Sequence, residues 1–489
     1  MSVSYGHRLT QLAAEHPDRT AVAMVDERGD EVHTSFGGLE ERATAAARLL
    51  EARGVGAGRM VVVALPNRLE HFTAVLGAWK LGACTLLLNP GMPPHERGAL
   101  LGLVPDAAVV CEWRDLSGRT VFTAGEVAAA PGGEPLSERI PWPGKATTSG
   151  GSTGTPKIIV DPDPWAATPG EQWAGIPALA GLRPGQRQLV SGSLYYNGPF
   201  SWAHFGLFEG HSLYVLEHFD AALALDLIER RRVQFAWTVP TMLLRMEREL
   251  QARPRDLSSL DAVMHAGGPC PPSVKRAWID HLGSNLMEFY GATESTGFTY
   301  VNGEEWLARP GTVGRPWRSE VRIVDDAGEA AAPGDVGEIY MRRPDRREPP
   351  FRYIGAPAPK TLPGGWYSVG DLGWFDDDGW LYVADRRTDM IVSGGANVYP
   401  AEVEASLVQH PNVVDAVVLG LADPDWGRRV HAVVQLSGPG ATDEADLERH
   451  CRTLLPAYKV PKSVEFVESL PRDASLKIRR SAMVAERGG

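Results

Sequence analysis

The chain has 489 residues, of which 43% are hydrophobic and 22% are charged. This length exceeds what one hydrophobic core usually supports, so we expect two or three folded domains and exclude wholesale disorder. The net charge of −12 disfavours nucleic acid or an anionic membrane as a partner.

The first half of the chain alternates helices with buried strands. Helical spacing over 36–56 precedes an apolar strand at 60–65, and a helix at 69–81 precedes a second apolar strand at 84–88. The same rhythm recurs at 186–246. Because apolar strands that alternate with helices are typical of parallel sheets covered on both faces, we expect an α/β fold, with doubly wound sheets in a large N-terminal domain.

After residue 300 the pattern changes to short strands separated by Asp-Asp, Asp-Gly and Pro-Gly turns. Strands are predicted at 320–324, 337–341 and 380–384. The proline-rich stretch 342–365 is predicted to be mostly loop. We interpret this part as a small antiparallel β subdomain.

A polar break at Asp385–Asp389 separates this subdomain from a second α/β rhythm. We therefore divide the chain into an N-terminal domain, 1–385, and a small α+β C-terminal domain, 386–489, joined by a hinge. Helices are predicted in the second domain at 400–409 and 443–454, and strands at 413–421, 430–436 and 463–467.

The location of the protein can also be predicted. No stretch approaches the roughly 18 apolar residues of a membrane-spanning helix, and the first eight residues lack the apolar run of a signal peptide. The four cysteines are far apart and form no CxxC pair, which suits a reducing compartment. We expect a cytoplasmic protein without a membrane anchor.

The strongest local pattern is the run TTSGGSTGTPK over 147–157. Its three glycines let backbone N–H groups approach an anion closely, its hydroxyls add donors, and Lys157 adds positive charge. The run is not a Walker A loop, because Gly154 is followed by Thr-Pro-Lys. The alternative is a surface linker rich in glycine and serine, which the apolar strand beginning at Ile158 disfavours.

The segment SGGSTGTPK at 149–157 resembles the signature of the adenylate-forming superfamily, which comprises acyl-CoA synthetases, peptide-synthetase adenylation domains and luciferases. The doubled glycine of this segment and HAGGPCP at 265–271 are most similar to ligases of fatty and bile acids. The family's other motifs follow in order as YGATE at 290–294, YSVGD at 367–371, DR at 385–386 with SGGANVYP at 393–400, and PRDASLKI at 471–478.

The resemblance implies a two-step reaction. ATP would activate a carboxylic acid to an acyl-adenylate with release of pyrophosphate, and CoA would then displace AMP. Thr293 would donate to the α-phosphate, and Glu294 would bind Mg²⁺. Tyr290 would lie against the adenine, and Asp371 would accept hydrogen bonds from both ribose hydroxyls. The other implied contacts of ATP or AMP are Thr148, Ser149, Gly150, Gly151, Ser152, Thr153, Gly154, Lys157, Gly267, Gly268, Pro269, Glu288, Phe289, Gly291, Ala292, Val383 and Arg386.

Lys477 is implied to be the catalytic lysine, which bridges the acyl carboxylate and the α-phosphate. The chain has eight lysines against 41 arginines, so a remaining lysine is modestly more frequent where a compact, movable ammonium is needed. Gly394 and Gly395 are implied to border the pantetheine tunnel of CoA, where bare backbone lets a thin chain pass. An ordinary surface lysine and a plain glycine turn are the alternatives.

Three residues depart from the family pattern. Tyr196 stands where the family usually has histidine, close to the acyl carboxylate and the thiol entrance, and lacks a pKa near neutrality. Thr388 stands at a hinge position often held by Asp or Lys, and Leu476 replaces the usual glycine before the catalytic lysine. The first two departures bear on the CoA step, and Leu476 bears on the freedom of the lysine loop.

The acid pocket is predicted between a helix at 235–247, the segment 195–205 and the strand end at 267–269. No Asp or Arg stands out there as a partner for an amine or a second carboxylate. We therefore expect a bulky apolar acid, which could be aryl, fatty or polycyclic. The candidate lining residues are Tyr196, Trp202, Trp237, Gly267, Gly268 and Gly291.

Several alternatives remain open. The enzyme could pass its acyl-adenylate to a carrier-protein thiol or to a separate partner instead of CoA. A non-catalytic nucleotide-binding relative is disfavoured because Lys477, Glu294 and Asp371 are all present, and a motor-type ATPase is disfavoured because the Walker lysine is absent. A homodimer is expected only from the frequency of such assemblies. A composition poor in lysine and rich in Ala, Arg and Gly is typical of GC-rich sources, where such ligases often serve natural-product biosynthesis.

Overall fold

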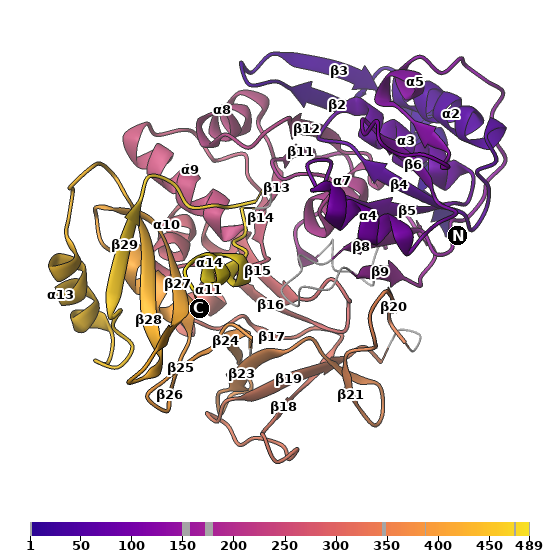
Figure 1. Ribbon diagram of the computed structural model, residues 1–489. Helices are drawn as coiled ribbons and strands as arrows, with labels where there is room; N and C mark the ends of the chain where they lie inside the picture. The colour runs from indigo at the N-terminus through magenta and orange to yellow at the C-terminus, as the bar shows by residue number, and fades with distance from the viewer. Residues whose placement is uncertain are drawn as a thin grey trace.

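The computed structural model describes residues 2–148, 157–171, 179–344, 349–386, 388–473 and 476–488. A large N-terminal domain carries two α/β sheets and an antiparallel sheet, and a small C-terminal domain lies against it (Figure 1). In Figure 1 the antiparallel strands β18, β19, β21, β23 and β24 lie toward the bottom, and the C-terminal domain, in orange and yellow, lies opposite the indigo N-terminal strands.

The larger sheet has nine strands, ordered β17-β16-β15-β14-β13-β11-β12-β2-β3. Its six central strands run parallel to one another, and antiparallel strands close both edges. The strands are β2 (Thr20–Val25), β3 (Glu31–Ser35), β11 (Arg187–Val190), β12 (Ser212–Leu216), β13 (Phe235–Thr238), β14 (Ala262–His265), β15 (Leu286–Gly291), β16 (Phe298–Asn302) and β17 (Arg315–Pro316).

The second sheet has seven strands, ordered β20-β9-β8-β5-β4-β6-β7. Strands β8 and β9 pair antiparallel at the edge of the parallel part of this sheet. The strands are β4 (Met60–Ala64), β5 (Cys84–Leu87), β6 (Ala108–Cys111), β7 (Val121–Phe122), β8 (Lys145–Thr148), β9 (Ile158–Asp161) and β20 (Arg352–Ile354), and a separate pair is β1 (Val3–Ser4) with β10 (Ala166–Ala167).

Helices cover the faces of these sheets, as the alternating pattern predicts. Local capping fixes where several begin: the Ser35 side chain caps α2, and Thr123 and Glu126 form a capping box on α5. The helices are α1 (Tyr5–Glu15), α2 (Phe36–Ala52), α3 (Leu69–Lys80), α4 (Pro94–Gly102), α5 (Ala124–Ala128), α7 (Asn197–Phe208), α8 (Ala221–Arg231), α9 (Pro240–Ala252), α10 (Pro272–Leu282), η2 (Gly283–Asn285) and α11 (Gly303–Ala308).

The predicted helix at 235–247 is wrong at its start. Residues Phe235–Thr238 form β13, a parallel strand of the large sheet, and the helix begins at Pro240. The aromatic and β-branched run before Pro240 favours a strand, and proline is well tolerated only in the first turn of a helix. The apolar residues on both sides of this boundary obscure it in the sequence.

The antiparallel subdomain is confirmed, and it extends into a segment predicted as loop. The stretch 342–365 contains β20 and β21, and β20 pairs with β9 of the second α/β sheet. Pairing with β9 thus stabilises a strand at Arg352–Ile354 although the surrounding stretch is rich in proline. The strands of the subdomain are β18 (Glu320–Val324), β19 (Gly337–Arg342), β21 (Lys360–Leu362), β22 (Trp366–Ser368), β23 (Asp371–Phe375) and β24 (Leu381–Arg386).

The C-terminal domain has a three-stranded sheet with helices packed on it. Strands β27 (Val413–Asp423), β28 (Gly427–Leu436) and β29 (Ser463–Val467) form the sheet, in that order. Two clusters of buried apolar side chains form its core. The remaining elements are the hairpin β25 (Ile391–Ser393) with β26 (Ala396–Val398), and the helices α12 (Pro400–Val408), α13 (Glu444–Leu454) and α14 (Arg480–Glu486).

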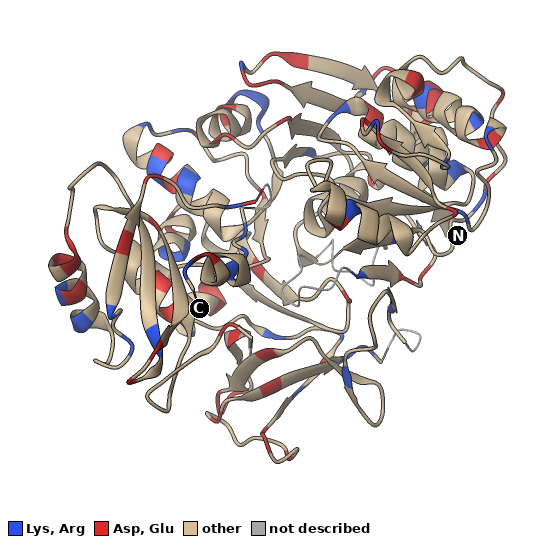
Figure 2. Cartoon of the chain, viewed as in Figure 1, with Lys and Arg blue, Asp and Glu red and all other residues tan. Residues whose placement is uncertain are grey.

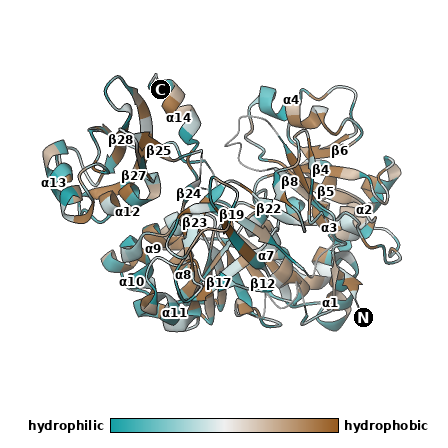
Figure 3. Cartoon of the chain, turned by 90° about the horizontal axis from the view of Figure 1, so that it is seen from below, coloured by the Kyte–Doolittle hydropathy of each residue, from teal (hydrophilic) through white to brown (hydrophobic). Residues whose placement is uncertain are grey.

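Burial follows the predicted strands closely. Residues Val61, Val62 and Val63 of β4 are fully buried, as expected for a strand covered on both faces. Figure 3 shows the inner strands of the N-terminal domain in brown and the outer helices with teal faces. Figure 2 shows acidic and basic residues interspersed over the visible elements. Within the described ranges, no helix is both long enough and apolar enough to cross a bilayer.

Candidate active site

The glycine-rich run is flanked by two paired strands. Thr148 ends β8, opposite Ile158 of β9. The residues Ser149, Gly150, Gly151, Ser152, Thr153 and Gly154 lie outside the described residues, together with Thr155 and Pro156. Their predicted phosphate contacts stay a prediction, and the structure shows only the strands from which the run emerges and returns.

The side chains of Lys157 and Glu294 both hydrogen-bond to the hydroxyl of Tyr353, a residue that the sequence analysis did not identify. The ammonium of Lys157 donates to the hydroxyl of Tyr353 at 3.1 Å and lies 3.6 Å from Oε1 of Glu294. The Tyr353 hydroxyl in turn donates to the same Glu294 oxygen at 2.6 Å. Burial raises the pKa of Tyr353, and the adjacent Glu294 carboxylate adds to this effect, so the phenol remains a donor at neutral pH.

A small cavity lies beside these groups. Glu294 is only 6% exposed, and Asp161 provides a second carboxylate on the cavity wall. One or two carboxylates next to phosphate oxygens suit Mg²⁺, which retains several other oxygen ligands. The donor set therefore fits the predicted metal, with Glu294 as its ligand. The lining residues are Lys145, Thr147, Ile159, Asp161, Thr293, Glu294, Ser295, Pro350 and Phe351.

Lys145 is a second residue absent from the sequence-based set. Its side chain is buried, and its ammonium donates to Oδ1 of Asn197 at 2.6 Å and to Oγ of Ser201 at 3.2 Å. Asn197 and Ser201 lie in α7, so Lys145 ties strand β8 to the helix that begins beside Tyr196. Lys145 lies two residues before the glycine-rich run, and no sequence pattern at this position indicates a functional role.

The predicted adenosine residues come together across two sheets. The Tyr290 hydroxyl on β15 donates to Oδ2 of Asp371 at 2.8 Å, and Asp371 begins β23 of the antiparallel subdomain. Val383 of β24 packs in the same apolar cluster as Tyr290. Arg386 ends β24, and its side chain lies outside the described residues. The structure thus joins Tyr290, Asp371 and Val383, although 81 residues separate the first two.

Two residues of the predicted nucleotide set are engaged within the protein. Glu288 forms a buried ion pair with Lys275, and the Phe289 ring packs on Phe298 with centroids 4.8 Å apart. The Glu288 side chain is thus held inside the protein, whereas Phe289 and Tyr290 are partly buried and Gly291 is exposed. Ala292 follows them in a turn.

The catalytic lysine predicted in the C-terminal domain reaches the N-terminal domain. A Cβ placed on Gly267 would lie 3.8 Å from both Cε and Nζ of Lys477. Gly267 has φ of +90°, which glycine adopts without strain. It follows β14 directly, and Gly268 and Pro269 continue the same exposed turn. The structure therefore holds Lys477 at the ends of the parallel strands, where the nucleotide residues also gather.

The acyl-pocket residues separate into two groups. Tyr196 caps α7, with its ring 4.8 Å from that of Tyr195, and Trp237 packs against Gly198 in the same helix. Trp202 lies deeper, against Phe205 and Phe235. Gly291 sits where a Cβ would lie 2.7 Å from the Phe298 ring. Tyr196 is partly exposed at the start of α7, whereas Trp202 and Trp237 are both buried in the large hydrophobic core.

The glycines predicted at the CoA tunnel lie in the hairpin β25–β26. Gly394 has φ of +56°, and a Cβ there would come within 2.5 Å of the Trp426 ring. A side chain at this position would therefore displace Trp426, and glycine lets the two segments pack closely. Gly395 has open space around its Cα. Thr388, the hinge departure, is exposed next to Asp389.

Comparisons with known proteins agree with this geometry. The model of the family described as AMP-binding enzyme matches residues 9–140 and 146–345, and that of the AMP-binding enzyme C-terminal domain matches 402–477. A curated relative, the 2-succinylbenzoate–CoA ligase of Geobacillus kaustophilus, is 34% identical over 486 residues, covering 96% of each chain.

Solved structures show the same likeness over the full chain. The o-succinylbenzoate CoA synthetase of Bacillus subtilis in complex with its acyl-adenylate intermediate is 26% identical, with a TM-score of 0.82 and coverage of 99% of this chain and 98% of that one. The same synthetase with ATP and a magnesium ion has a TM-score of 0.80, is 27% identical and covers 98% and 99%. The amide bond synthetase McbA of Marinactinospora thermotolerans is 26% identical, with a TM-score of 0.80 and coverage of 99% of each chain.

Proposed function

The chain belongs to the AMP-binding enzyme family, and from this premise we propose that it activates a carboxylic acid with ATP and transfers the acyl group to CoA. It is thus an AMP-forming acid–thiol ligase. One observation carries the proposal: Lys477 of the C-terminal domain lies at Gly267, which follows β14, and β14 pairs with β15, the strand that precedes Thr293 and Glu294. This arrangement supports the proposal that the Lys477 ammonium lies between an acyl carboxylate and the α-phosphate during the reaction.

The first step must bring two anions together. A carboxylate oxygen attacks the α-phosphorus of ATP, the new bond forms the acyl-adenylate, and pyrophosphate leaves. Charge shifts between the carboxylate and phosphate oxygens during this displacement, so a cation between them stabilises the transition state more than the ground state. The ammonium of Lys477 supplies that charge, and Thr293 would donate to an α-phosphate oxygen.

The nucleotide would be held from two sides. The Tyr290–Asp371 pair provides an aromatic face and a buried carboxylate on one side. Lys157 and Glu294 lie on the phosphate side, where Mg²⁺ would neutralise phosphate charge when bound. The Tyr353 hydroxyl accepts a hydrogen bond from Lys157 and donates one to Glu294, so it holds both side chains at the phosphate side of the site.

Replacing Asp371 with asparagine is expected to raise the KM for ATP about 10- to 30-fold and to change kcat much less. The reason is that the amide keeps the Tyr290 contact but loses charge-assisted hydrogen bonds to the ribose, each worth about 1.5–3 kcal/mol. Steady-state kinetics with varied ATP measures the effect. Asp377→Asn, in the exposed turn after β23, is the matched control. A kcat loss as large as the KM change would contradict a ground-state role for Asp371.

The second step requires access for a thiol. The CoA sulfur attacks the acyl carbonyl carbon, and AMP leaves with the oxygen that came from the acid. We place the boundary of the two domains at 385/386 and the hinge at Asp385–Asp389, so that the C-terminal domain could present Gly394 and Gly395 to CoA after adenylation. The open space around Gly395 supports this placement.

An aryl acid is the substrate class that the site supports best. Tyr196 is partly exposed at the start of α7, and the buried Trp237 ring packs against Gly198 in the first turn of that helix. We infer that these rings form an aromatic wall, which suits flat apolar ligands. The curated relatives are named for 2-succinylbenzoate, which has an aromatic ring and, unlike the acid expected from the sequence, a second carboxylate. The experiment is a panel of 2-succinylbenzoate, substituted benzoates, medium-chain fatty acids and bile acids, each with ATP and Mg²⁺, with and without CoA.

Pyrophosphate release with aryl acids at least tenfold faster than with fatty or bile acids would support this assignment, since a pocket of matching shape discriminates by about 10- to 200-fold per misfitted group. Preference for a fatty or bile acid would overturn the aryl assignment and leave the ligase intact. No acid-dependent pyrophosphate release from any acid would overturn the proposed function.

A second acceptor is favoured by one observation. The amide bond synthetase McbA shares the fold over the whole chain, and this chain has Tyr196 in place of the usual histidine near the predicted thiol entrance. Acyl-adenylate that accumulates in the panel whether or not CoA is present would favour transfer to an amine or to a carrier-protein thiol instead of CoA.

A further inference from the structure

The residue before Lys477 has a backbone conformation that its side chain disfavours. Leu476 has φ of +61°, in the left-handed region where Cβ crowds the following carbonyl oxygen. Glycine adopts this region freely. The presence of leucine at such a φ indicates that its side chain contributes something that offsets the strain.

The side chain of Leu476 crosses the boundary between the domains. Leu476 belongs to the C-terminal domain by sequence, yet it packs against the hydrophobic core of the N-terminal domain, which is formed by residues between Val3 and Trp306. The next residue, Lys477, lies at Gly267 of that domain. The apolar contact and the catalytic ammonium thus enter the N-terminal domain together.

Hydrogen bonds hold the turn in this form. The Leu476 amide donates to the carbonyl of Asp473 at 2.8 Å, and the Arg472 guanidinium donates to the Leu476 carbonyl at 2.8 Å. The amide of Lys477 donates to Oδ1 of Asp473 at 3.1 Å. Arg472 also binds both carboxylate oxygens of Asp415, at 2.5 and 2.7 Å, which ties the turn to strand β27.

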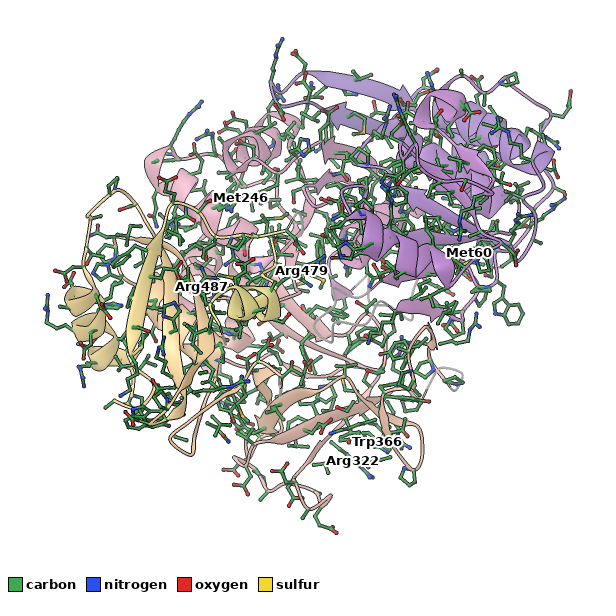
Figure 4. The ribbon with its side chains drawn as sticks, viewed as in Figure 1. Met60, Met246, Arg322, Trp366, Arg479 and Arg487 are labelled. Carbon is green, nitrogen blue, oxygen red and sulfur yellow. The ribbon has the colours of Figure 1, made fainter. Side chains whose placement is uncertain are left out.

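Strand β27 is itself held by the N-terminal domain. Arg248 of α9 donates to the carbonyls of Val414 at 2.6 Å and Val413 at 2.9 Å, directly before Asp415. On the other side of the turn, Arg479 donates to Glu96 of α4 at 2.8 Å. Figure 4 labels Arg479 where the C-terminal domain faces the N-terminal sheets, and Met246 marks α9. Polar contacts therefore flank the apolar contact of Leu476.

We propose that Leu476 is a positioning residue that anchors the lysine turn to the N-terminal domain and so favours acyl-adenylate formation over attack by CoA. The anchor must be released before the C-terminal domain can rotate, so it sets the balance between the two arrangements. This inference rests on the proposed two-step function. Its consequence is that acyl-adenylate persists longer on this enzyme than it would with glycine at this position.

The test compares three substitutions by rapid quench. One rate is acyl-adenylate formation from ATP and 2-succinylbenzoate, and the other is acyl-CoA formation when CoA is added to the preformed adenylate. The ratio of the first rate to the second is expected to fall about tenfold in Leu476→Ala, which keeps the strain and loses the contact. Leu476→Met keeps an apolar contact and should retain the ratio. Leu454→Ala, at an exposed leucine of α13, is the control.

Leu476→Gly separates anchoring from a merely structural role. Glycine relieves the strain but loses the contact, so the anchor predicts a ratio between those of wild type and Leu476→Ala. If Leu476 only shaped the turn, Leu476→Gly would have a ratio at least as high as wild type, because glycine adopts a positive φ without strain. A ratio in Leu476→Gly equal to or above wild type, or an unchanged ratio in Leu476→Ala, would overturn the proposal.

Hydrogen–deuterium exchange distinguishes failure of the anchor from failure of the proposed function, because it needs no acid. If wild type forms no acyl-adenylate with any acid of the panel, the proposed function is wrong and exchange decides the inference alone. The amides of Leu476 and Lys477 should exchange about tenfold faster in Leu476→Ala than in wild type, since local opening follows the lost contact. Unchanged exchange at both amides would overturn the anchor.

Discussion

Replacing Lys477 with alanine is expected to slow acid-dependent pyrophosphate release about 100- to 1,000-fold, the usual loss when one preorganised donor to a developing charge is removed. The physical reason is that the side chain ends at Gly267, where we propose that it contacts the reacting carboxylate, whereas the Tyr290–Asp371 pair proposed to hold the adenosine does not involve it. The affinity for ATP should therefore change little. Quenched-flow assays of pyrophosphate and equilibrium binding of ATP measure the two quantities.

Two further variants make this prediction specific. Lys477→Arg keeps the charge but replaces the compact ammonium with a planar fork, so it should recover only part of the rate. Lys360→Ala removes an exposed lysine on β21 that pairs with Glu338, and should leave the rate unchanged. Equal losses in Lys477→Ala and Lys360→Ala, or no loss in either, would remove Lys477 from the reaction.

Replacing Glu294 with glutamine is expected to lower kcat about 100-fold and to raise the Mg²⁺ concentration needed for half-maximal rate about tenfold, because the amide loses the charge that binds a hard cation. The size of the side chain is kept, and its oxygen can still accept from Tyr353. Titration of activity with Mg²⁺ at saturating ATP measures both changes.

The control for Glu294 is Glu304→Gln, at an exposed carboxylate in the first turn of α11. It should match wild type in rate and in Mg²⁺ dependence. An undisturbed Mg²⁺ titration in Glu294→Gln would show that the carboxylate does not hold the metal. In that case Asp161, on the wall of the same cavity, becomes the candidate ligand.

Much of the fold could be predicted because its strands carry strong local patterns. The valine run at 60–65 became the buried strand β4, and the strands predicted at 320–324 and 463–467 have the same bounds in the structure. The boundary at Pro240 was missed because a strand of apolar residues is followed directly by the apolar face of a helix. The spacing of apolar residues does not change visibly where the strand ends and the helix begins. Strand β20 was missed because its stability comes from pairing with β9, which is distant in sequence.

The residues of the site could be predicted only where they belong to a family motif. Tyr290 and Asp371 are 81 residues apart and meet as expected from the resemblance. Tyr353 was missed because it lies in a proline-rich stretch without a pattern, and its role arises only when β20 brings it to Glu294. The cross-domain contacts of Leu476 and Arg248 depend on how two domains pack, which no local spacing encodes.

The measurement that tests the central claim most directly follows an oxygen atom. The enzyme is supplied with ATP, Mg²⁺, CoA and the best acid of the panel, with ¹⁸O in its carboxylate, and the products are examined by mass spectrometry. Because the carboxylate attacks the α-phosphorus and AMP later leaves with that oxygen, we predict AMP that carries one ¹⁸O, unlabelled pyrophosphate, and acyl-CoA. Formation of ADP together with ¹⁸O-labelled inorganic phosphate would show attack at the γ-phosphorus and contradict the account.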